Sequence, residues 1–186
     1  RFADAWHHYT RRPSSRHPFP LEHLPKDLEG KRILVERDQG LGDEIFFLRF
    51  IPQLKRGAWV AYRPDPRLGS MLSRVEGIDR IAASDETLEA LDFTFSVGDL
   101  PLLLGMDHVS KVPLPLPLIP LPERVEMMRK KLLGLGPAPY IGATWRAGTQ
   151  DSRGLLYKET PKEQLAQALR GLPGTVLILQ RHPQPG

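Results

Sequence analysis

The sequence predicts an α/β fold with a parallel sheet, and three observations support this. Short apolar segments typical of strands begin at about residue 31 and alternate with amphipathic segments that have helical spacing. Strands that alternate with helices in this way form parallel sheets covered on both faces. The alternation stops at a proline-rich stretch and then starts again. The chain is therefore expected to contain one complete α/β domain and the beginning of another.

Composition limits the function classes. Hydrophobic residues make up 40% of the 186 residues and charged residues 26%, as in ordinary globular proteins. The 26 Lys and Arg exceed the 22 Asp and Glu by only four, and no long run of like charge occurs, so we expect no nucleic-acid binding. The absence of cysteine excludes disulfides and thiolate metal sites. No apolar run reaches the ~18 residues that a transmembrane helix needs.

Residues 1–30 are expected to form a helix followed by a connector. Apolar side chains from Phe2 to Tyr9 recur at helical spacing and predict a short amphipathic helix. Pro13 ends it, and the segment up to residue 30, rich in Pro, His and Ser, predicts an extended connector. Because the chain starts with Arg1, we expect it to be part of a longer protein.

Residues 31–137 are expected to form the first domain. Its predicted strands are RILVE, WVAYR, DRIAA and DFTFSV. Its predicted helices are GDEIFFLRFIPQLKRG, PRLGSMLSRV, DETLEAL and ERVEMMRKKLLGLG, and LPLLLGM predicts a helical turn. VPLPLPLIPLP (residues 112–122) cannot join a sheet interior because its prolines lack amide donors. It predicts a polyproline-type strap with Leu114, Leu116 and Leu118 partly buried, and a ligand for an SH3-type domain is the alternative interpretation.

Residues 138–186 are expected to begin a second domain. YIGATW and TVLILQ predict strands, and PKEQLAQALRGL between them predicts a helix. Thr160 is the expected N-cap of this helix and Pro161 its first residue. Two strands and one helix are too few to bury both faces of a sheet, so this domain is expected to be incomplete.

The candidate site is RDQGLGDE, which follows the first predicted strand. Ligands of parallel sheets bind at the carboxyl ends of strands, where Gly40 and Gly42 can take positive φ and leave room for a substrate. Ile45 stands where the dinucleotide fingerprint has its third glycine, and the lysine of a Walker loop is absent. Asp43 has two interpretations: it caps the helix that follows, or it acts as a general base.

The stretch VERDQGLGDEIFFLRFIPQL resembles the EQGLGD signature of bacterial glycosyltransferase-like domains that follow tetratricopeptide repeats. These domains are related to the heptosyltransferases of glycosyltransferase family 9. The segments AWHHYTRR, DLEGKRILV, YIGATWRAGTQ and LYKETPKEQLAQAL resemble further parts of such proteins, in the same order. The likeness covers most of the chain.

The resemblance implies a GT-B architecture, in which two Rossmann-like domains face each other across a cleft. The acceptor binds the first domain, and the sugar nucleotide binds mainly the second. Asp43 is then the base that deprotonates the acceptor hydroxyl in an inverting transfer. The implied substrate-binding residues are Gln39, Gly40 and Gly42, and the implied nucleotide-sugar-binding residues are Arg146, Gly148, Thr149 and Lys158.

The expected partners follow from the same resemblance. They are a nucleotide-diphosphate sugar as donor substrate, a glycan, lipid or protein acceptor, and proteins that bind upstream repeats. No cofactor is expected, and the six histidines lack the spacing of a metal site. The expected location is the cytoplasm, with peripheral attachment to the inner membrane as an alternative. Because the loop WRAGT and the stretch YKETP depart from most relatives, a domain that binds partners without catalysis is the alternative function.

Overall fold

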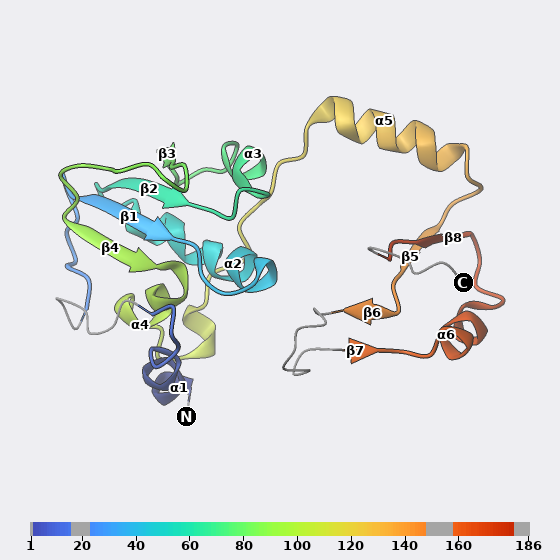
Figure 1. Cartoon of the computed structure of the whole chain (residues 1–186), viewed down its shortest axis with the longest axis horizontal. Helices are drawn as coiled ribbons and strands as arrows, with labels where there is room; N and C mark the ends of the chain where they lie inside the picture. Colours follow the sequence, from blue (N-terminus) through green and yellow to red (C-terminus); the bar gives the residue numbers. More distant parts are fainter. Residues whose placement is uncertain (1, 16–22, 148–157, 181–186) are drawn as a thin grey trace. The chain divides into compact units, whose positions relative to one another are not determined.

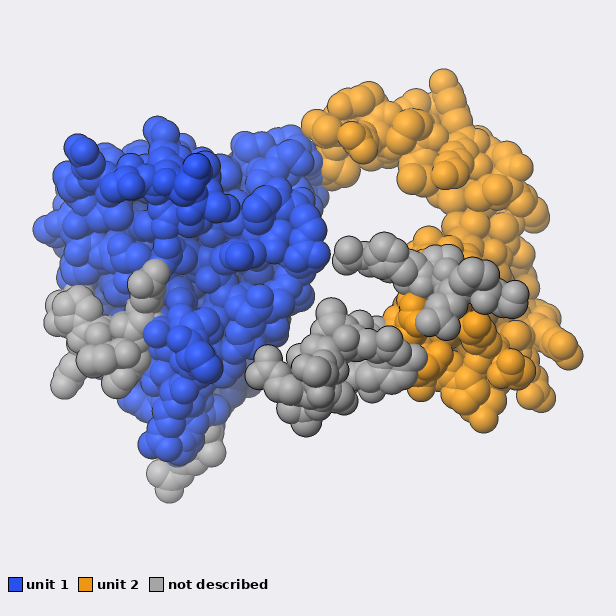
Figure 2. All heavy atoms as spheres, viewed as in Figure 1, with its two compact units in different colours: residues 1–119 blue, residues 120–186 orange. Residues whose placement is uncertain are grey.

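The computed structural model describes residues 2–15, 23–147 and 158–180. The chain divides into two compact units, residues 1–119 and residues 120–186 (Figure 2). Helix α5 (Pro122–Leu133) thus belongs to the second unit, whereas the boundary predicted from the sequence follows this helix. The sequence-based division at residues 137 and 138 stays a prediction.

The first unit is built on a four-stranded parallel sheet (Figure 1). Its strands are β1 (Arg32–Glu36), β2 (Trp59–Arg63), β3 (Arg80–Ile81) and β4 (Phe93–Ser96), in the order β3-β2-β1-β4. In the central strand, Ile33 lies opposite Val60 of β2 and Phe93 of β4. The middle residues of β1 and β2 are all buried, as expected of parallel strands covered on both faces. The predicted α/β class is confirmed.

Short helices surround this sheet. They are α1 (Phe2–Tyr9), α2 (Leu41–Phe47), α3 (Gly69–Leu72) and α4 (Leu100–Leu103), with 3₁₀ turns η1 (Leu48–Leu54), η2 (Val97–Asp99) and η3 (Val109–Lys111). Pro52 explains why α2 is short. Its ring excludes the α-helical bond to the carbonyl of Leu48, and the chain changes to 3₁₀ geometry at that residue.

The core of the first unit lies between the sheet and these helices. Its largest buried side chains include Tyr62, Phe50 and Phe95. Helix α1 joins the core through aromatic contacts. The ring centroids of Trp6 and Tyr9 lie 6.3 and 5.5 Å from the ring centroid of Phe47 in α2. The first helix is therefore packed on the body of the unit.

Two predictions for the first unit were wrong. Residues 85–91 form no helix, because Glu86 is engaged in loop contacts: its carboxylate accepts a hydrogen bond from the amide of Ala83, and its carbonyl accepts one from Arg63. Of the three strap leucines predicted to be partly buried, only Leu116 is so. Leu114 and Leu118 are exposed, with 86% and 38% of their surface accessible.

The second unit contains less regular structure. Strand β5 (Tyr140–Ala143) pairs in parallel with β8 (Thr175–Ile178), and β6 (Arg146–Ala147) pairs antiparallel with β7 (Lys158–Glu159). Helix α6 (Lys162–Leu169) has Pro161 as its N-cap, one residue later than predicted. Thr160 does not cap it, because the Thr160 amide bonds the carbonyl of Trp145 and continues the β6–β7 pairing.

Candidate functional site

The loop from β1 to α2 places the predicted substrate-binding residues at the carboxyl edge of the sheet. Gln39, Gly40 and Gly42 are all exposed there. The left-handed conformation expected of the glycines belongs instead to Gln39, with φ of 45°, whereas Gly40 is extended at −90°. Such a backbone is uncommon for a residue with a side chain and is typical of positions held by their surroundings.

Asp43 is exposed on the first turn of α2. Gly40 is the N-cap of this helix, so Asp43 is its third residue rather than its cap. The Asp43 carboxylate accepts one long hydrogen bond, 3.4 Å, from the amide of Gly40. An acidic side chain in this position also suits the helix dipole. The contact is too weak to occupy the carboxylate, which remains open to solvent and to a ligand.

Glu44, the next residue, is buried and lies in a hydrogen-bond network that the sequence did not reveal. Its Oε1 accepts hydrogen bonds from the Tyr62 hydroxyl at 2.9 Å and from the Asp65 amide at 3.0 Å. Burial raises the pKa of Glu44 against the opposing effect of these two bonds. Burial also raises the pKa of Tyr62, and the negative charge of Glu44 adds to it. The network fixes the first turn of α2 to the end of β2.

Asp65, two residues beyond β2, holds two arginines. Arg67 donates to Asp65 from Nε at 2.8 Å and from Nη2 at 2.9 Å, and Arg37 donates from Nη1 at 2.8 Å. These bonds, chiefly those from Arg67, hold the pKa of Asp65 well below its usual range. The Asp65 side chain is only 11% exposed, while those of Arg37 and Arg67 are 55% and 56% exposed.

A second charged cluster closes another part of this edge. The strand order reverses between β1 and β4, which is where ligands of open α/β sheets bind. Here the buried guanidinium of Arg12 enters from the segment after α1. It donates Nε to Asp38 and Nη2 to Asp99, each at 2.7 Å. The Ser15 hydroxyl also donates to Asp99, at 2.8 Å.

This clamp, defined as Arg12, Asp38 and Asp99, is tightly packed. Its three side chains are at most 7% exposed. A Cβ at Gly98 would lie 2.5 Å from the Asp38 carboxylate and 2.7 Å from the Arg12 guanidinium, so only glycine fits without a shift. The ring of Tyr9 lies under the Arg12 guanidinium. Burial raises the pKa of Tyr9, the positive charge of Arg12 lowers it, and the negative charges of Asp38, Asp43 and Asp99 raise it further.

The carboxyl edge therefore has a closed part and an open part. The clamp closes the part between β1 and β4. The exposed residues of the open part are Arg37, Gln39, Gly40, Gly42, Asp43 and Arg67. The sequence pointed to the glycine loop and Asp43, but not to the arginines or to the clamp. One usable signal was present, because an aspartate follows each of β1, β2 and β4 within three residues.

The residues predicted to bind the nucleotide sugar lie in the second unit. The Arg146 amide donates to Gln180 Oε1 at 3.0 Å, and Arg146 pairs with Glu159 across the β6–β7 ladder. Lys158 pairs with Ala147, next to Arg146, so the backbones of the two predicted cations are adjacent. Gly148 and Thr149 lie outside the described residues.

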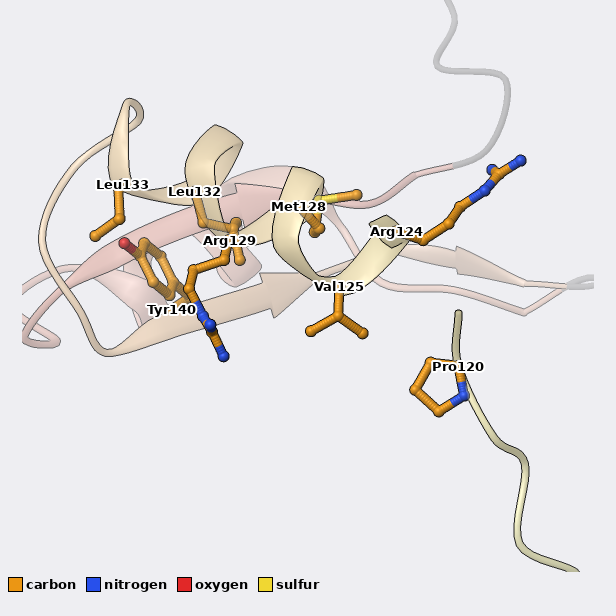
Figure 3. Close-up of a pocket in the computed structure, with 8 residues that line it drawn as sticks. All are labelled: Pro120, Arg124, Val125, Met128, Arg129, Leu132, Leu133 and Tyr140. Carbon is orange, nitrogen blue, oxygen red and sulfur yellow. The ribbon is translucent and has the colours of Figure 1, made fainter. Parts of the chain in front are cut away.

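The second unit also carries an apolar groove of about 540 Å³ along α5 (Figure 3). It is lined by Pro120, Arg124, Val125, Met128, Arg129, Leu132, Leu133 and Tyr140. Apart from the two arginines these side chains offer little for hydrogen bonding, so the groove is no candidate for a reaction site. Within the described ranges no cluster of His, Asp and Glu suited to a metal ion occurs, and every helix there is too short or too polar to cross a bilayer.

Comparisons with known proteins found one similar protein and no matching family. No protein-family model matches the sequence, and no solved structure matches the chain. The protein FlbA of Caulobacter vibrioides is 26% identical over 141 residues, which cover 66% of this chain and 24% of FlbA. The chain thus spans about a quarter of that relative. What the fold itself defines is an α/β unit with a four-stranded parallel sheet and a polar carboxyl edge.

Proposed function

We propose that the chain is part of a glycosyltransferase of GT-B type that moves a sugar from a nucleotide-diphosphate donor to an acceptor hydroxyl with inversion. In this proposal the first unit binds the acceptor, and residues 138–186 begin the nucleotide-sugar-binding domain. The resemblance of the QGLGD loop and of the second-domain segments supports it. The parallel sheet and the position of the loop at its carboxyl edge agree with it.

The observation that carries the proposal is the exposed carboxylate of Asp43 at the ligand edge. Asp43 takes the proton of the acceptor hydroxyl while that oxygen bonds to the anomeric carbon of the donor. The bond from the anomeric carbon to the diphosphate breaks at the same time, and the nucleoside diphosphate leaves with the electron pair. Arg146, Thr149 and Lys158 are the proposed donors that stabilise its negative charge.

Substitution of Asp43 tests the proposed base. In the complete gene product that carries this sequence, Asp43→Asn and Asp43→Ala should lower transfer from the donor sugar by about 10²–10⁴-fold, the usual contribution of general-base catalysis. The measurement is release of nucleoside diphosphate over a panel of nucleotide sugars. Asp4→Asn is the matched control, because Asp4 is also an exposed aspartate in the first turn of a short helix. Full activity in both Asp43 variants would refute the base.

A domain that binds partners without catalysis is the second candidate. The position of Asp43 in the first turn of α2 favours it, because an acidic side chain there stabilises the start of a helix whether or not it reacts. Calorimetry of the complete gene product with nucleoside diphosphates separates the candidates. Binding to one of them supports the transferase, and no binding at high micromolar concentration supports the scaffold.

A further inference from the structure

The open part of the carboxyl edge contains two arginines fixed by one carboxylate. Arg37 Nη1 and Arg67 Nη2 both donate to the same oxygen, Asp65 Oδ2, at 2.8 and 2.9 Å. The other oxygen of Asp65 accepts from the Arg67 amide at 3.0 Å and from Arg67 Nε at 2.8 Å. Asp65 thus uses both oxygens, and it holds the two guanidinium groups close enough for one small anion to touch both.

These arginines keep unused donors. In the described part of the chain, Nε of Arg37 and Nη1 of Arg67 have no hydrogen-bond partner, and both side chains are more than half exposed. Two positive charges face one negative charge at Asp65. The pair therefore presents net positive charge and free N–H groups to solvent.

The pair also has a defined place in the fold. Arg37 directly follows β1, and the Asp65 amide is bonded to Glu44 in the first turn of α2. Ordinary surface ion pairs are mobile and contribute little. Here the anchoring carboxylate is itself nearly buried and tied through the backbone to Glu44, so the arginines start from a preorganised position.

We propose that Arg37 and Arg67 form a binding site for one phosphate or carboxylate group of a ligand that lies at the carboxyl edge of the sheet. Planar guanidinium groups match such oxyanions with paired hydrogen bonds. If the proposed transferase function holds, on which this step rests, the ligand is the acceptor, and it carries an anionic substituent near the hydroxyl that reacts.

Titrations of the 186-residue chain test the site. Amide spectra recorded at low ionic strength should show saturable shifts at Arg37, Asp65 and Arg67 with inorganic phosphate, and none with glucose. A parallel titration with glucuronate shows whether a carboxylate serves as well as a phosphate. Arg37→Gln and Arg67→Gln should each weaken phosphate binding about tenfold, because each removes charge-assisted hydrogen bonds.

Arg56→Gln is the matched control, since Arg56 is exposed in the turn before β2, at the opposite end of the strand, and its loss changes the net charge equally. Absence of saturable phosphate binding in the wild-type chain overturns the site, as does equal weakening by Arg56→Gln. Arg37 makes only one of the bonds to Asp65, so Arg37→Gln remains decisive even if Arg67→Gln unfolds. The phosphate titration measures anion binding alone, whereas release of nucleoside diphosphate measures transfer, so the anion site and the proposed base can fail separately.

Discussion

Asp43 and Glu44 are consecutive carboxylates with opposite environments. Asp43 is exposed, whereas Glu44 is 1% exposed and accepts two hydrogen bonds. Successive residues of a helix point about 100° apart, so one faces the ligand edge and the other faces the core. The buried carboxylate fixes the turn on which the exposed one is carried. Glu44 is thus a positioning residue, and no catalytic role is assigned to it.

Two substitutions of Glu44 separate its role as a hydrogen-bond acceptor from the effect of its charge on stability. Glu44→Ala should lower the free energy of unfolding by about 2–4 kcal/mol, because the Tyr62 hydroxyl and the Asp65 amide lose their acceptor. Glu44→Gln keeps an acceptor oxygen and should stay within about 1 kcal/mol of the wild type. Urea unfolding measures both changes.

The pH dependence provides a second readout at Glu44. Its pKa in the folded state is raised from 4.5, so the folded chain binds this proton more tightly than the unfolded chain does. The contribution of Glu44 to stability is therefore fully present below pH 4.5 and is lost as the pH rises through the higher folded value. Glu44→Gln should lack this loss. An unchanged pH profile in Glu44→Gln would contradict the role of burial.

At the scale of elements, the sequence was most informative where local pattern and tertiary environment agree. RILVE and WVAYR are apolar throughout their middles and form the two central strands. The segment DETLEAL has a helical pattern, yet Glu86 is taken up by Arg63 and the Ala83 amide, contacts that no local pattern reveals. The glycine loop could likewise be found from sequence. The clamp could not, because Arg12 and Asp99 are brought together only by the fold.

The clamp predicts a large effect of Arg12. Arg12→Ala should lower the free energy of unfolding by about 3–5 kcal/mol, because it leaves two buried carboxylates without their counter-ion. Hydrogen exchange should also become faster in residues 9–15, which the guanidinium fastens to the sheet edge.

Arg11→Ala is the control for this prediction. Arg11 is adjacent in sequence but exposed, so its loss should change stability by less than about 0.5 kcal/mol. Similar effects of the two substitutions on unfolding would show that the clamp does not hold the segment.

At the scale of the whole molecule, the two units differ in how much core they contain. Among the described residues, all the buried hydrophobic side chains except that of Ala143 lie in the first unit. The sequence predicts a complete first domain and the beginning of a second, and that division stays a prediction.

Truncation tests the independence of the first unit. A chain of residues 1–119 should unfold cooperatively and give a dispersed amide spectrum, because its core cluster is complete. Residues 120–186 alone should unfold without a sharp transition, since little apolar surface is buried there. Circular dichroism during heating distinguishes the two. A broad, non-cooperative transition for residues 1–119 would mean that the first unit depends on the rest of the chain.

The absence of a side chain at Gly98 links three positions that lie far apart in the sequence. A single methyl group at that position would occupy the space of the Arg12 guanidinium and the Asp38 carboxylate. A larger residue at position 98 would therefore have to displace the ends of these two side chains, so we expect Gly98 to be exchanged only together with a change in the clamp.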